Sequence, residues 1–183
     1  MNPGKIMRYT AFFENARIAG GSNPAEVALA IRDRPGALIF EDATGKQIDL
    51  DTRGSEEEIR ARHALPARGP GRPRLGVTAR EVTLLPRHWD WLARQPGGAS
   101  VALRKLVEAA MRDPKAERIA ARDAAYRFAS AMGGNAAGFE EAMRALYAGK
   151  RKKFRRQIEG WPPDVRAHLE KIAAPAFGDD AED

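Results

Sequence analysis

The sequence of 183 residues contains no cysteine, only three histidines and few aromatic residues. Without cysteine the chain can form neither disulfide bonds nor thiolate metal ligands. His63, His88 and His168 stand too far apart for local ligand spacing, so we expect no metal and no cofactor. No apolar run approaches the roughly 18 residues of a membrane span, and the first residues lack the pattern of a signal peptide. These absences predict a cytoplasmic protein without a membrane partner.

The basic residues are unevenly distributed. Residues 60–112 hold 11 basic and 3 acidic side chains, whereas residues 1–59 have a net charge of −3 and residues 113–183 of +1. A coding bias toward arginine and alanine could raise the overall charge, but it does not explain this asymmetry. A basic excess confined to one segment is typical of a local binding surface for a polyanion such as DNA.

The first part of the chain, residues 1–65, has the pattern of a small α+β module. Strand-like residues at 8–13 and 17–19 predict one hairpin, and those at 37–40 and 46–50 predict a second. Between them, Asn23 and Pro24 are suited to the start of a helix. Ser55 and Glu58 have the spacing of a capping box, which predicts another helix.

Proline and glycine mark the later boundaries. Residues 66–76 combine Pro, Gly and Arg and predict a basic linker. Residues 113–177 predict a helical unit with helices at 116–132, 138–149, 150–158 and 163–173. Residues 178–183 form an acidic tail that we expect to be disordered. The fold class is therefore predicted to be α+β.

Residues 77–112 predict a strand followed by two helices. Val82 and Leu84 alternate with polar residues up to Pro86, where a helix can start. Ser100 is placed to cap the second helix. A strand without a partner in its own segment leaves an open edge, so we expect two copies to pair as a homodimer. Its core would contain Val82, Leu84, Trp89, Leu92, Leu103 and Leu106.

This order of elements resembles the ribbon-helix-helix family of DNA-binding proteins. The resemblance rests on the strand at 80–85, the helix starting at Leu85 and Pro86, the turn at 98–100, and the start of a second helix at 100–104. It implies that the paired strands enter the major groove, and that the N-terminus of the second helix, at Ala99, Ser100 and Val101, holds a phosphate.

The strand offers few groove-reading side chains. Thr83 and Arg80 are the candidates, but Arg80 shares the apolar face with Val82 and Leu84, and the opposite face includes Glu81. A shift of one residue in the strand register would turn every side chain to the opposite face, so Arg80 would become exposed and Glu81 buried.

Two other basic stretches have competing interpretations. Gly71-Arg72-Pro73-Arg74 resembles the core of an AT-hook, which lies in the minor groove; the alternative is a plain linker whose Arg72 and Arg74 contact phosphates. Residues 150–156 form a dense basic run with one aromatic residue, Phe154. On a helix Phe154 and Ile158 would pack inward and leave a solvated basic face; binding of nucleic acid or of an acidic partner is the alternative.

The chain as a whole is similar to a bacterial family catalogued only as a domain of unknown function. The similarity rests on REVTLLPRHW at 80–89, GGASVAL at 97–103 and AYRF at 125–128. We find no nucleotide-binding loop and no nucleophile beside a histidine, and therefore do not expect an enzyme. The sequence favours a double-stranded DNA-binding protein, either a transcriptional regulator or a nucleoid-associated protein. The alternative is a dimeric interaction module, antitoxin-like or an adaptor, that binds an acidic protein.

Overall fold

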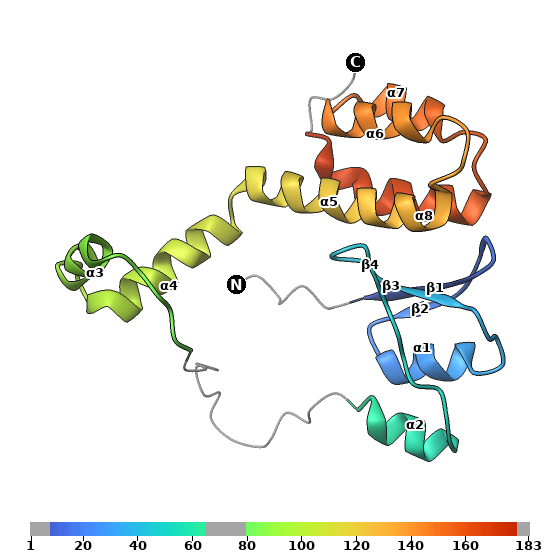
Figure 1. Cartoon of the computed structure of the whole chain (residues 1–183), viewed down its shortest axis with the longest axis horizontal. Coiled ribbons are helices and arrows are strands. Elements are labelled where there is room, and N and C mark those ends of the chain that lie inside the picture. The colour runs from blue at the N-terminus through green and yellow to red at the C-terminus, as the bar shows by residue number, and fades with distance from the viewer. Residues whose placement is uncertain (1–7, 65–79, 179–183) are drawn as a thin grey trace. The chain divides into compact units, whose positions relative to one another are not determined.

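The computed structural model describes residues 8–64 and 80–178, which divide into two compact units (Figure 1). The first, which we call the sheet unit, comprises residues 1–65 and 117–183. The second, the hairpin unit, comprises residues 66–116. The predicted linker at 66–76, with Arg72 and Arg74, lies outside the described residues.

The sheet unit is built on four antiparallel strands in the order β2-β1-β3-β4. They are β1 (Tyr9–Phe13), β2 (Ala16–Gly21), β3 (Leu38–Glu41) and β4 (Lys46–Ile48). Both predicted hairpins are confirmed. The turn between β3 and β4 uses Gly45 at φ +63°, in the left-handed region that glycine adopts without steric cost.

Both N-terminal helices begin at the residues that the sequence predicts. In α1 (Pro24–Ile31) the Asn23 side chain accepts a hydrogen bond from the Ala25 N–H at 3.0 Å. In α2 (Glu56–Arg62) Ser55 and Glu58 form a complete capping box, because each side chain accepts the other residue's backbone N–H. These bonds satisfy N–H groups that have no partner inside the helix.

The rest of the sheet unit is helical, as predicted. It contains α5 (Pro114–Gly133) from Glu117 onward, α6 (Phe139–Tyr147), α7 (Arg151–Gln157), α8 (Pro163–Ala173) and the short 3₁₀ helix η1 (Ala174–Ala176). Within the ranges that the structure describes, no helix combines the length and the apolar composition needed to cross a membrane.

Helices cover both faces of the sheet (Figure 1). On one face Ala11 and Ile39 pack against Val27 and Ile31 of α1. The opposite face contributes its side chains to a larger core with α5 to α8. Since alternate side chains of a strand point to opposite faces, burial of consecutive residues in β1 and β3 places the sheet between two helical layers.

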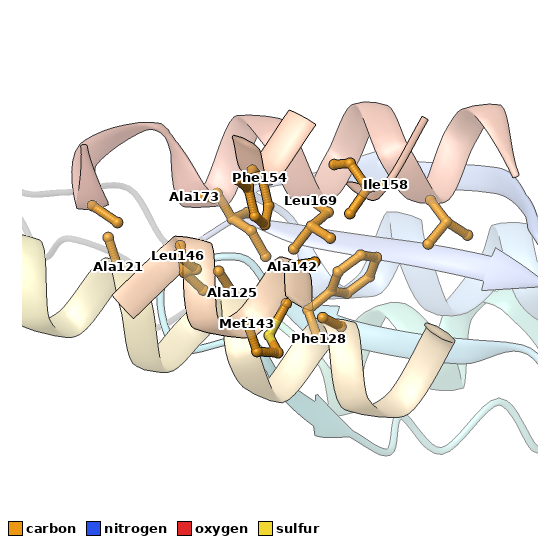
Figure 2. Packing of buried hydrophobic residues seen from close by; sticks show 14 of the residues in the cluster. Ala121, Ala125, Phe128, Ala142, Met143, Leu146, Phe154, Ile158, Leu169 and Ala173 are labelled. Atoms are coloured by element: carbon orange, nitrogen blue, oxygen red, sulfur yellow. The ribbon is translucent and has the colours of Figure 1, made fainter. Parts of the chain in front are cut away.

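Three phenylalanines join the N-terminal and C-terminal parts of the chain. The ring of Phe128 on α5 lies 5.4 Å from that of Phe12 on β1 and 4.9 Å from that of Phe40 on β3, and all three side chains are fully buried. Figure 2 shows the same core from the helical side, with the labelled side chains of α5, α6 and α8 directed toward one another. The two segments that the sequence analysis describes separately thus form one compact unit.

The hairpin unit contains α3 (Pro86–Ala93) and α4 (Gly98–Met111). Ser100 does not cap α4 as predicted. The helix begins at Gly98, and its N-cap is Gly97, three residues before Ser100. Gly97 has φ +85°, a conformation that glycine tolerates and serine does not favour. Residues 80–85 form neither strand nor helix in the single chain. A two-stranded ribbon needs a second copy of this segment, so the predicted pairing stays a prediction.

Candidate functional site

The hairpin unit contains the whole net charge of the protein. Residues 66–116 include ten basic and four acidic side chains, a net charge of +6, whereas the remaining residues include 21 of each sign. The sheet unit is therefore neutral overall. A charge excess confined to 51 residues of one compact unit creates a far stronger local potential than the same excess spread over the chain.

The first turn of α4 has the features of a phosphate site. Ala99 and Ser100 are the second and third residues of the helix, and the turn has no acidic residue. The Gly98 N–H is already bonded to the Gln95 carbonyl at 2.9 Å. Arg104, one turn further along the helix, donates from Nε to the Ser100 carbonyl at 3.2 Å. Backbone N–H groups, the helix dipole and an arginine together favour an anion.

The other predicted DNA contacts are only partly described. The side chains of Arg80 and Thr83 are exposed, and Val101 is half-buried. Arg72 and Arg74 lie outside the described residues. The structure thus gives positions for the α4 turn and the segment before α3, but none for the AT-hook-like stretch.

Large apolar side chains of the hairpin unit are exposed to solvent. Val82 is 55% exposed, Trp89 42% and Leu106 50%. Of the predicted dimer-core residues only Leu92 is buried, while Leu84 and Leu103 are half-buried. Soluble proteins seldom leave many large apolar groups uncovered in one small unit. We call this set the apolar surface of the hairpin unit; it comprises Val82, Leu85, Trp89, Trp91, Leu106, Val107 and Met111.

The basic run at 150–156 packs as the sequence predicts. Phe154 and Ile158 are buried at 1% and 0% exposure. Two of the basic side chains have acidic neighbours, because Lys153 bonds Glu141 at 3.3 Å and Arg155 lies 3.8 Å from Glu170. The run therefore contributes to the core and to surface ion pairs.

The sheet unit contains a polar group that the sequence analysis did not identify. Asp42, directly after β3, accepts a hydrogen bond from the Thr10 hydroxyl at 2.7 Å and one from the Lys171 ammonium at 3.0 Å. The Nε2 atom of His168 lies 3.6 Å from the same carboxylate. We call these four residues the Asp42 cluster. It joins β1, the end of β3 and α8.

His168 is an uncharged buried member of this cluster. It is 4% exposed and packs against the rings of Phe12 and Phe128, at 5.5 Å and 4.7 Å. Its Nε2 atom has no hydrogen-bond partner among the described residues. Burial lowers the pKa of His168 from 6.5 to about 4, although the Asp42 charge opposes the shift. Thr10 is 1% exposed, so its hydroxyl is closed to solvent and is unsuited to attack a substrate.

The sequence could have indicated only two of the four residues of this cluster. Thr10 on β1 pairs with Phe40 on β3, and Asp42 directly follows β3, so strand pairing could have suggested their contact. Nothing in the sequence indicates that His168 and Lys171 on a distant helix reach the same carboxylate. Among the described residues, no group of three His, Asp or Glu side chains is placed to hold a metal ion.

The protein is thus an α+β protein in which a neutral sheet unit is joined to a basic helical hairpin. The chain belongs to the family of uncharacterised proteins conserved in bacteria, DUF2239, which matches residues 8–173. The match includes residues of both units. Comparison with curated proteins and with solved structures gives no match.

Proposed function

We propose that this protein binds double-stranded DNA as a homodimer through its hairpin unit. The observation that supports this most directly is the concentration of the entire net charge of +6 in residues 66–116. Two copies would present twice this charge to one duplex. Each phosphate that a basic group neutralises releases condensed counterions, which supplies affinity without any base contact.

The first turn of α4 supplies the proposed phosphate anchor. The N–H groups of Ala99 and Ser100 would donate hydrogen bonds to a phosphate oxygen, and Arg104, one turn further along the helix, would add positive charge. Such a contact fixes the position of the protein on DNA but reads no sequence. Arg72 and Arg74 would add further phosphate contacts, and Thr83 and Arg80 are the candidates for contacts inside the groove.

The apolar surface supports the homodimer. Pairing of residues 80–85 from two chains would form a ribbon that can enter the major groove. It would also cover Val82, Trp89 and Leu106, which are at least 42% exposed in the single chain. A dimer of this kind is the architecture of a transcriptional regulator or a nucleoid-associated protein.

Fluorescence anisotropy with a labelled random duplex tests DNA binding. We expect micromolar or tighter affinity at about 50 mM salt, and a loss of about 10³-fold at about 200 mM if six phosphates are contacted. The double variant Arg72→Ala with Arg74→Ala should lower the salt slope by about two. The matched control, Arg32→Ala with Lys46→Ala, removes the same charge from exposed positions of the sheet unit. Absence of binding at low salt by folded, dimeric protein refutes the proposal.

Leu106→Glu tests the dimer separately. A charge in the apolar surface should give a monomer in light scattering and weaken DNA binding, because the anchors on two chains would no longer act together. Ile119→Glu is the control, since Ile119 is equally exposed but lies in the sheet unit. Both variants should keep the circular dichroism of the wild type. A Leu106→Glu protein that stays dimeric excludes this surface as the dimer contact.

A protein-interaction module is the second candidate. Glu81 favours it, because an exposed carboxylate within the proposed ribbon would repel phosphate. In this case the apolar surface would still form the dimer, and the basic side chains would bind an acidic protein. A dimer that does not bind DNA at low salt would support this second candidate.

A further inference from the structure

The sheet unit contains a pocket of about 210 Å³ beside the Asp42 cluster. It lies among the residues that follow β3, the first half of α5 and the end of α8. This volume is below the range of pockets for drug-sized ligands, about 300–1,000 Å³, and suits a small metabolite. Its apolar wall is formed by Ala43, Ala120, Ala121, Ala124, Ile172 and Pro175.

Charged groups of both signs line the same pocket. Arg8 and Lys171 are basic, and Asp42 and Glu117 are acidic. Two positive and two negative side chains therefore line the pocket, and it is not selective for a simple anion or a simple cation. An apolar wall with both signs of charge is complementary to a small molecule that has an ammonium group, a carboxylate group and a hydrocarbon side chain.

The Asp42 carboxylate is already held in place. Its Oδ1 accepts from Thr10 at 2.7 Å and its Oδ2 from Lys171 at 3.0 Å, and its side chain is only 12% exposed. An ionised carboxylate has about four lone-pair positions, so each oxygen can accept one more hydrogen bond. The backbone N–H of Asp42 donates to the Arg8 carbonyl at 2.9 Å, which fixes the strand ends beside the pocket. A carboxylate fixed before binding loses little freedom when a ligand arrives.

We propose that this pocket binds an amino acid with an aliphatic side chain. The ligand's ammonium group would donate to Asp42 and Glu117, and its carboxylate would accept from Arg8 and Lys171. Its side chain would lie on the wall of Ala120, Ala124 and Ile172. This site is independent of the proposed DNA contacts, which all belong to the hairpin unit.

Isothermal titration calorimetry of the full chain with leucine, isoleucine, valine and methionine tests the site. We expect saturable binding of at least one of them, and a higher Tm in its presence. For leucine the matched probes are 4-methylpentanoate, which lacks the ammonium group, and 3-methylbutylamine, which lacks the carboxylate. Each should bind at least about tenfold more weakly, because a charge-assisted hydrogen bond is lost. Absence of binding by all four amino acids, or binding of either truncated probe as tight as that of leucine, refutes the proposal.

Replacement of either of two alanines on α5 by phenylalanine tests where the ligand binds. Ala120→Phe should abolish binding by filling the pocket, since Ala120 is an exposed residue on its wall. Ala131→Phe is the control, because Ala131 is exposed on the same helix but does not line the pocket. If Ala120→Phe binds the amino acid like the wild type, the ligand occupies another place. DNA affinity, measured in parallel, distinguishes this failure from a failure of the proposed function.

Discussion

The buried imidazole of His168 should make the stability of this protein fall in mild acid. Its pKa is about 4 in the folded protein, against 6.5 for an exposed histidine. Between these values the unfolded chain binds a proton that the folded chain does not, so lowering the pH favours unfolding. The stabilising difference is complete above about pH 6.5 and decreases as the pH falls toward 4.

The size of the effect follows from the separation of the two pKa values. The difference between a pKa of 6.5 and one of about 4 corresponds to at most about 3 kcal/mol of unfolding free energy. Integrated over the titration, His168 should remove about 2 kcal/mol of unfolding free energy at pH 5 and about 3 kcal/mol at pH 4. These losses are a large part of a typical domain stability of about 5–15 kcal/mol.

His168→Leu isolates this contribution from the acid response of the carboxylates. Leucine has a similar volume and fits between Phe12 and Phe128. It also removes the Nε2 atom, which has no hydrogen-bond partner in the described part of the chain. Urea denaturation from pH 7 to pH 4 should give a flatter stability curve for the variant. His168→Gln, polar but not titrating, should be equally flat. Parallel curves for wild type and both variants would refute the reasoning, as would a wild type that gains stability relative to them in acid through an ion pair with Asp42.

Two further predictions concern backbone positions. Gly45→Ala should cost about 2–4 kcal/mol of unfolding free energy, because Gly45 has φ +63° and its added Cβ would overlap the Ala124 backbone. Gly36→Ala, at φ +88° with nothing within 4 Å, should cost only about 1 kcal/mol; equal losses in urea denaturation would contradict the packing argument. Ser55→Ala should cost about 1 kcal/mol through the lost cap, with faster amide hydrogen exchange in α2; unchanged exchange at the Glu58 amide would show that the capping box does not stabilise the helix.

Local signals in the sequence predicted most of the secondary structure. The cap residues Asn23 and Ser55 set the starts of α1 and α2, because their side chains satisfy N–H groups that the helix leaves unpaired. The start of α4 was missed, since a glycine at positive φ can begin a helix without a side-chain cap. The family membership was also predicted from sequence, and it is confirmed over residues 8–173.

One of the candidate sites could be predicted from the sequence, and the others could not. The basic excess of residues 60–112 follows from counting charges, so it was visible without a structure. The Asp42 cluster was not, because it joins groups from β1, the end of β3 and α8 that have no common local pattern. The amino-acid pocket next to it depends on the same long-range packing.

The sequence by itself determined the α+β class, the hairpins, the helices and the segregation of charge, because these depend on neighbours a few residues apart. Only the tertiary structure decided that residues 8–64 and 117–178 share one core, with Phe12 and Phe40 packed against Phe128. It also decided that His168 is buried beside Asp42, where burial lowers the pKa of its imidazole. Desolvation depends on all the chain segments around a group, and no segment's own pattern contains that information.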